Sequence, residues 1–213
     1  MTQMKCLRYT DIIWDFDGTL FDTYPKMVNS FKRALLDEGV TADQEEILSY
    51  MKVSAKDALM HYKSRYSIRE GFMERFQKYE KDVKAEEVHP FPYAEEVCIE
   101  IKELGGRNFI VTHRGESTMD ILKYHGMLGL FTEVVTKNNG FKRKPDPEAF
   151  QYIIDKYNIN KKKALIVGDR EFEAAAAKAV GVKSCLYDTN KVDRITQPEY
   201  YIQSLKELYE VIL

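Results

Sequence analysis

Hydrophobic residues in this chain gather in short unbroken runs, and longer stretches with helical spacing lie between most of them. Short apolar runs without alternation are typical of strands buried on both faces, as in parallel sheets. They predict five strands, at Ile12–Phe16, Phe109–Thr112, Glu133–Thr136, Ala164–Gly168 and Val182–Tyr187.

Helical patterns separate most of these runs. Apolar residues from Ala94 to Leu104 recur at helical spacing and are followed by Gly105-Gly106, a common helix end. Three more helices are predicted: one that Ser117 caps and Gly126 closes, one over Glu148–Tyr157 after Pro147, and one over Glu171–Val180 that stops at Gly181. Alternating strands and helices predict a doubly wound α/β fold with its site at the carboxyl ends of parallel strands.

Residues 23–88 break this alternation, because they contain amphipathic helical patterns and no convincing strand. An insertion of this length is too long for a crossover loop. We therefore expect an α/β core domain of residues 1–22 and 89–213, and a separate helical domain of residues 23–88. Thr23 and Pro25 fit the entry to the insertion, and Val88–Pro92 fits its exit as a stiff linker.

Composition narrows the function classes. A chain of 213 residues that is 44% hydrophobic can bury one core and a small satellite. A net charge of −2 gives no basic surface for nucleic acid, and no apolar run approaches the ~20 residues that cross a bilayer. The scattered Cys6, Cys98 and Cys185, and an N-terminus without a signal-peptide pattern, favour a cytoplasmic protein with reduced thiols.

Two acids after the first predicted strand are the strongest chemical signal. Asp15 and Asp17 share one face of an extended chain, and Gly18 then permits a sharp turn. Such a pair can bind a cation and exchange protons. The alternative is two solvated loop acids, since Asp-Gly is also a common turn dipeptide.

Polar residues at later strand ends extend this signal. Thr112 ends one apolar run, Lys144 precedes Pro145 and a helix, and Asp169 ends another run with Glu173 four residues later. This ordered set resembles the haloacid dehalogenase-like hydrolase superfamily, in particular its phosphoglycolate phosphatase-like branch. The resemblance covers essentially the whole chain.

The resemblance implies a role for each residue. Asp15 would be the nucleophile that forms an aspartyl-phosphate, and Asp17 the general acid and base. Thr112 and Lys144 would bind phosphate oxygens, with His113 as a further candidate. His113 and Arg114 could also contact a second anionic group of the substrate, although such residues more often pair with local carboxylates.

The resemblance also implies Mg²⁺ and a cap. The metal would be held by the Asp15 carboxylate, the Asp17 backbone carbonyl and the Asp169 carboxylate. Glu173 stands where the family often has Asp, so it would hold a metal-bound water or position Lys144. Residues 23–88 occupy the position of the small helical cap that closes over the active site.

We therefore expect a Mg²⁺-dependent phosphatase acting on a small phosphorylated metabolite, as a monomer or weak dimer with no nucleic-acid or membrane partner. Dehalogenases of the superfamily lack the second acid, so Asp17 argues against them. A phosphomutase of the β-phosphoglucomutase type stays open, because it shares every core motif. A non-catalytic binding or regulatory protein is the other alternative, although it would not need a proton donor at Asp17.

Overall fold

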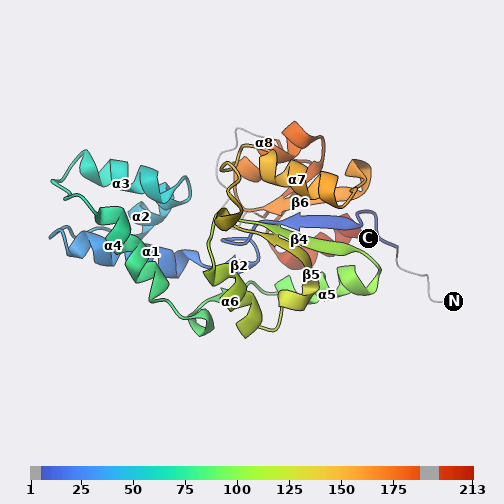
Figure 1. Cartoon of the computed structure of the whole chain (residues 1–213), viewed down its shortest axis with the longest axis horizontal. Coiled ribbons are helices and arrows are strands. Elements are labelled where there is room, and N and C mark those ends of the chain that lie inside the picture. The colour runs from blue at the N-terminus through green and yellow to red at the C-terminus, as the bar shows by residue number, and fades with distance from the viewer. Residues whose placement is uncertain (1–5, 188–196) are drawn as a thin grey trace. The chain divides into compact units, whose positions relative to one another are not determined.

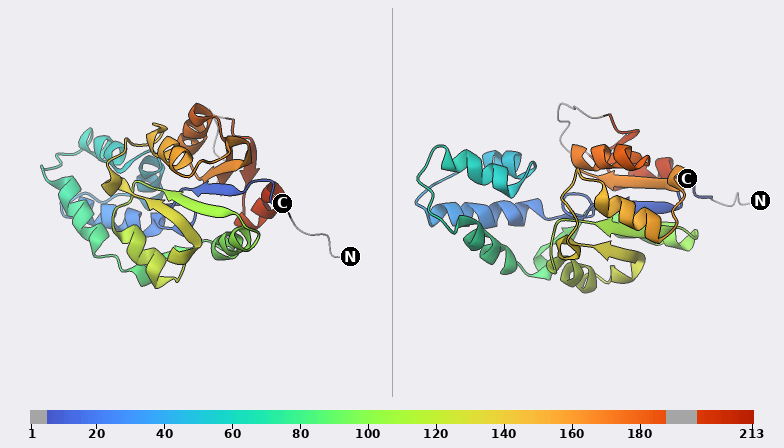
Figure 2. Two further views of the ribbon diagram at one scale, coloured as in Figure 1. Left: turned by 45° about the vertical axis from the view of Figure 1, so that its right-hand side comes forward. Right: turned by 45° about the horizontal axis from the view of Figure 1, so that its top comes forward.

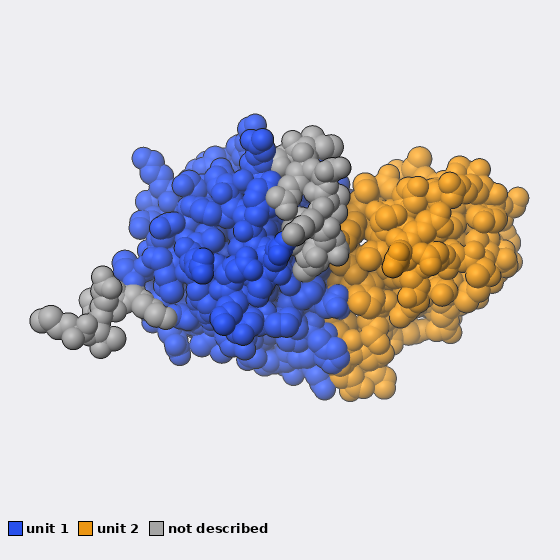
Figure 3. All heavy atoms as spheres, turned by 180° about the vertical axis from the view of Figure 1, so that it is seen from behind, with its two compact units in different colours: residues 1–22, 89–213 blue, residues 23–88 orange. Residues whose placement is uncertain are grey.

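A computed structural model describes residues 6–187 and 197–213 of the chain (Figure 1). The chain divides into two compact units, Met1–Asp22 with His89–Leu213 and Thr23–Val88 (Figure 3). Residues 1–5 and 188–196, which belong to the expected core domain, lie outside the described residues.

The first unit is built on a parallel sheet of six strands in the order β5-β4-β1-β6-β7-β8. The strands are β1 (Asp11–Trp14), β4 (Arg107–Val111), β5 (Phe131–Val135), β6 (Ala164–Gly168), β7 (Lys183–Tyr187) and β8 (Tyr200–Ile202). Crossovers on both sides of the central β1 confirm the predicted doubly wound α/β class.

Helices cover both faces of this sheet (Figure 1). They are α5 (Ala94–Glu103), α6 (Ser117–Tyr124), α7 (Glu148–Lys156), α8 (Glu171–Val180) and α9 (Leu208–Ile212). One core joins α7 and α8 to β1, β4 and β6 through Ile13, Phe109 and Ile166. On the other face the Trp14 indole donates to Asn108 Oδ1 at 3.0 Å, and Asn108 Nδ2 donates to the Cys98 carbonyl of α5.

Glycine predicted the end of a helix correctly, whereas serine did not predict the start of one. Gly181 ends α8 with a φ of 71°, a left-handed conformation that glycine adopts without strain. The expectation that Ser117 caps α6 is wrong, because the cap position is Glu116 and Ser117 is already helical. The Ser117 hydroxyl instead accepts a hydrogen bond from Arg114 Nη1 at 3.2 Å.

Two strand pairings escaped the sequence pattern. β2 (Phe21–Asp22) pairs antiparallel with β3 (His89–Pro90), so the expected stiff linker is one half of a short ribbon. β8 pairs with β7 at the sheet edge and follows a polar stretch that gives no strand signal. Each pairing joins segments that are distant in the chain or only weakly apolar. The local pattern of hydrophobic residues does not predict such pairings.

The second unit consists of α1 (Tyr24–Leu36), α2 (Gln44–Met51), α3 (Ala55–Lys63) and α4 (Phe72–Lys81), which Figure 2 shows from two further directions. It has its own core, in which Phe31 packs against Phe72 and Phe76. The side chain of Asp43 caps α2, and that of Ser54 caps α3.

Short 3₁₀ turns complete the described secondary structure, at Ala85–Glu87, Leu128–Leu130, Lys137–Asn139, Lys161–Lys163 and Leu205–Glu207. The 3₁₀ turn Lys161–Lys163 lies between α7 and β6, and its three lysines are exposed. Among the helices of the described residues, none has the length and apolar character needed to span a membrane.

Candidate active site

Asp15 lies at the carboxyl end of β1, where backbone hydrogen bonds and packing hold it in place. Its backbone N–H donates to the Val167 carbonyl at 2.8 Å, which extends the ladder between β1 and β6. The next residue, Phe16, is fully buried and stacks on Phe21 with ring centroids 4.7 Å apart. Gly18 has a φ of 78° and donates its N–H to the Phe21 carbonyl, which closes the turn. The side chain of Asp15 is buried, which removes the alternative of a solvated loop acid.

Lys144 joins Asp15 to Glu173. Its ammonium Nζ lies 2.6 Å from Asp15 Oδ1 and 2.8 Å from Glu173 Oε1, and it donates to the Val111 carbonyl at 3.0 Å. Burial alone would lower the pKa of Lys144, but the charges of Asp15 and Glu173 outweigh it and raise that pKa. Lys144 is therefore a fixed cation between two carboxylates at the strand ends.

Glu173 is held in place by the turn that leads from β6 into α8. Its Oε2 accepts from the Arg170 N–H at 3.3 Å, and its side chain packs directly over Gly168. A Cβ at position 168 would collide with the Glu173 side chain, so this close approach requires glycine. Burial opposes ionisation of Glu173, but Lys144 and Arg170 lower its pKa. The contact with Lys144 favours the positioning role expected for Glu173.

Three carboxylates meet at the ends of β1 and β6. Oxygens of Asp15, Asp169 and Glu173 lie within 4.8 Å of one another. The Arg170 guanidinium faces all three, with closest distances of 3.7, 3.6 and 3.5 Å. Within the described residues, Asp15 Oδ2 is buried without a hydrogen-bond partner. Carboxylate oxygens converging in this way fit a hard divalent cation such as Mg²⁺.

Thr112 and His113 follow β4 and make different contacts. Thr112 is buried, and its Oγ1 accepts from the Arg114 N–H at 3.1 Å, which leaves its own proton to donate. His113 Nε2 accepts from the Lys144 N–H at 2.7 Å. Burial and the charges of Lys144 and Arg143 lower the pKa of His113 to about 4. His113 is thus neutral, and only its Nδ1–H remains to contact a phosphate.

Asp17 is paired with Arg114. Arg114 Nε lies 2.7 Å from Asp17 Oδ1, with both side chains largely buried. The sequence left open whether Arg114 contacts a substrate anion or a local carboxylate, and the structure has the carboxylate contact. Its partner was not predictable, because the two residues are 97 positions apart. The only signal in the sequence was an arginine two residues beyond the end of the predicted strand Phe109–Thr112.

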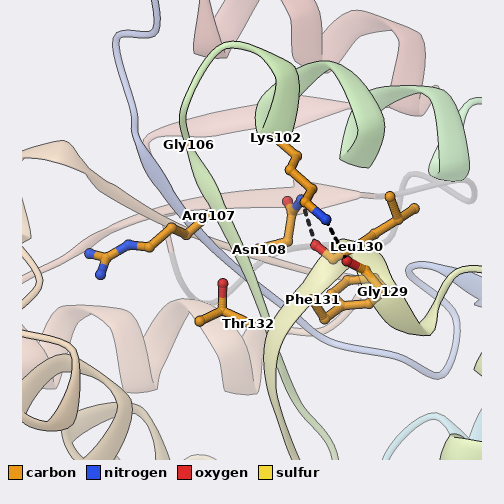
Figure 4. A pocket seen from close by; sticks show the side chains of 8 residues that line it. All are labelled: Lys102, Gly106, Arg107, Asn108, Gly129, Leu130, Phe131 and Thr132. Atoms are coloured by element: carbon orange, nitrogen blue, oxygen red, sulfur yellow. Dashed lines mark hydrogen bonds between the residues drawn. The ribbon is translucent and has the colours of Figure 1, made fainter.

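A hollow of about 300 Å³ lies elsewhere, at the amino ends of β4 and β5 (Figure 4). Two of its polar side chains donate to backbone carbonyls that also line it: Lys102 Nζ to the Gly129 carbonyl at 2.7 Å, and Asn108 Nδ2 to the Leu130 carbonyl at 3.3 Å. It contains none of the residues that the sequence singled out for chemistry. The candidate active site is therefore at the opposite end of the sheet.

Known proteins are similar to this chain over most of its length. The sequence profile of the haloacid dehalogenase-like hydrolases matches residues 12–187. A phosphoglycolate phosphatase of Vibrio parahaemolyticus is 27% identical over 94% of this chain and 95% of its own, and the pyrophosphatase PpaX of Oceanobacillus iheyensis is 24% identical with the same coverage.

Solved structures agree with the sequence relatives. The crystal structure of a hydrolase from Streptococcus pneumoniae TIGR4 is 31% identical, covers 96% of this chain and 98% of its own, and superposes with a TM-score of 0.65. The matched profile spans most of the chain and includes Asp15, Thr112, Lys144 and Asp169. This chain belongs to the haloacid dehalogenase-like hydrolase family.

Proposed function

We propose that this hydrolase is a Mg²⁺-dependent phosphatase that acts on a small phosphorylated metabolite through an aspartyl-phosphate on Asp15. The observation that carries the proposal is the buried ion pair between Asp15 and Lys144, at 2.6 Å. Asp15 lies close to Asp169 and is followed two residues later by a second acid, Asp17. A phosphoryl transfer site needs a nucleophile, neutralising charge and a proton for the leaving oxygen. These residues supply each of them.

The reaction takes two steps. An Asp15 carboxylate oxygen attacks phosphorus, the bond to the leaving oxygen breaks, and Asp17 gives that oxygen a proton. Lys144 and the Thr112 hydroxyl bind the phosphoryl oxygens during the transfer. Asp17 then takes a proton from water as the water oxygen attacks phosphorus, and the bond to Asp15 breaks to release phosphate.

The acidic cluster has the chemistry of a magnesium site. Asp15, Asp169 and the backbone carbonyl of Asp17 would hold the ion, with Glu173 near it and on Lys144. When bound, Mg²⁺ neutralises phosphate charge and favours the ionised form of the nucleophile. The buried Asp15 Oδ2, which accepts no hydrogen bond from the described part of the chain, supports this assignment.

Two further features bear on the substrate and its setting. The names of the relatives, phosphoglycolate phosphatase and pyrophosphatase, support a small phosphate ester or anhydride. The helical unit of residues 23–88 would act as a cap that selects the leaving group, and its insertion directly after β2, six residues beyond Asp17, supports this role. Free thiols at Cys6, Cys98 and Cys185 support a cytoplasmic location.

A panel of phosphorylated metabolites tests the proposal. We expect the purified protein to release inorganic phosphate from small esters in the presence of Mg²⁺ and to stop when EDTA removes the metal. Hexose phosphates are assayed with and without a sugar bisphosphate. Isomerisation that requires the bisphosphate, with no phosphate release, would identify a phosphomutase instead. No turnover of any compound under either condition would contradict an enzymatic role.

A further inference from the structure

One arginine ties the loop after β4 to the turn after β1. Arg114 Nε pairs with Asp17 Oδ1 at 2.7 Å, and the Arg114 backbone N–H donates to Thr112 Oγ1 at 3.1 Å. A single residue therefore contacts both the proposed acid and the proposed phosphate-binding hydroxyl. These two groups act on opposite sides of the bond that breaks.

The arginine is itself held from several sides. Its Nη1 donates to Ser117 Oγ at 3.2 Å in the first turn of α6, and its carbonyl accepts from the Lys137 N–H at 3.1 Å. The next residue, Gly115, lies against the Lys137 side chain so closely that a Cβ would fall 2.7 Å from Lys137 Cε. The Arg114 side chain is 13% exposed, against 68% for the side chain of Arg69, which pairs with Glu38 in the helical unit. Arg114 is thus fixed before substrate binds.

We propose that Arg114 is a positioning residue for general acid–base catalysis by Asp17, an inference that rests on the proposed phosphatase function. A carboxyl group has two oxygens, and the pair with Arg114 uses Oδ1. Oδ2 is then the atom that transfers the proton. As the P–O bond breaks, the proton moves from Oδ2 to the leaving oxygen, and the carboxylate that remains is already paired with the guanidinium. In the second step the same oxygen takes the proton from water.

This role predicts a dependence on the leaving group. The leaving group of an alkyl phosphate is a strongly basic alkoxide, which needs a proton as it departs. The leaving group of p-nitrophenyl phosphate is p-nitrophenolate, a weak base that departs with little help from an acid. The ratio kcat/KM reports on the steps up to departure of the leaving group, so it isolates the acid role from hydrolysis of the intermediate. A residue with a purely structural role would lower kcat/KM for both esters alike.

The test measures kcat/KM of Arg114→Met on p-nitrophenyl phosphate and on an alkyl phosphate of the panel, with 2-phosphoglycolate tried first. We expect a loss of about 10²-fold on the alkyl ester and less than about 10-fold on p-nitrophenyl phosphate. Arg114→Lys, which keeps a cation, should recover part of the alkyl-ester rate. Ser117→Ala, which removes only one hydrogen bond to the guanidinium, should show the same selectivity with a smaller loss, and it replaces Arg114→Met if that variant does not fold.

Arg107→Met is the matched control. Arg107 Nε pairs with Asp11 Oδ1 at 2.5 Å, through the same two types of atom, but at the amino end of β1. We expect any loss in this variant to be equal for the two esters. Equal losses in Arg114→Met, or the alkyl-selective pattern in Arg107→Met, would overturn the inference and leave the phosphatase function standing. A wild-type protein that hydrolyses neither ester nor any compound of the panel would overturn both.

Discussion

Two acids separated by one residue have different surroundings in this site. Asp15 is almost completely buried against Lys144, whereas Asp17 is less deeply buried and pairs with Arg114. A nucleophile needs a fixed position at phosphorus, and an acid–base group needs a free oxygen for proton transfer. The sequence predicted the pair from strand periodicity, but not its ion pairs, because these join residues far apart in the chain.

Replacing Asp17 with Asn should separate its two proposed roles. The amide cannot transfer the proton, so we expect kcat to fall by ~10²–10⁴-fold. The backbone carbonyl is unchanged, so Mg²⁺ affinity measured by titration calorimetry should fall by less than about 10-fold. A variant that keeps its rate and loses Mg²⁺ binding would show that the side chain is a metal ligand and not the acid.

His113 should make stability depend on pH. The folded protein keeps its pKa at about 4, below the value of about 6.5 for an unfolded histidine, so the unfolded state binds the extra proton in that window. The free energy of unfolding should therefore fall as pH decreases from about 6.5 to 4.5, by about 1–2 kcal/mol for this partly exposed group.

His113→Gln is the variant for this prediction, because its side-chain oxygen can still accept from the Lys144 N–H. Denaturant unfolding at a series of pH values should show that the free energy of unfolding depends less on pH in the variant than in the wild type. The free energies of the two proteins should differ less at pH 7.5 than at pH 4.5. Parallel profiles for the two proteins would show that His113 does not carry the effect.

At the scale of elements, strand ends position the chemistry. Short apolar runs predicted five of the six strands of the sheet. Each candidate site residue lies either just after the end of a strand or near the start of a helix. Edge strand β8 and the β2–β3 ribbon escaped because they are short and depend on pairing with distant segments. The turn from β6 into α8 is sterically constrained, since Gly168 lies directly beneath the Glu173 side chain.

Gly168→Ala should disturb this turn. The added methyl group collides with the Glu173 side chain, so we expect a loss of about 1–3 kcal/mol in the free energy of unfolding and lower phosphatase activity as the Lys144 contact shifts. Gly129→Ala is the control, because an added Cβ there meets no atom within 4 Å. Equal stability of the two variants in urea titrations would contradict the steric argument.

At the scale of the whole molecule, each of the two units has a hydrophobic core of its own. The helical unit has its own buried set around Phe31, separate from the core under the sheet. The sequence predicted these two domains from a break in strand–helix alternation.

Replacing residues 23–88 with a short linker tests the cap. The site residues all lie in the first unit, so we expect this truncated protein to keep Mg²⁺ binding and weak activity on p-nitrophenyl phosphate. Its ranking of small esters should change, because the leaving group would no longer be selected. Circular dichroism checks that the core stays folded. A folded protein that keeps the wild-type ranking would exclude the helical unit as the specificity element.

The central claim is a covalent phosphoryl group on Asp15. The most direct measurement is acid quench of the enzyme during turnover, followed by mass spectrometry of the peptide that contains Asp15. We predict a phosphate on Asp15 that is stable in acid and released by hydroxylamine, and none in Asp15→Asn, whose turnover should fall by at least ~10³-fold. Rapid turnover with no phosphate on Asp15, or a near wild-type rate in Asp15→Asn, would contradict the account.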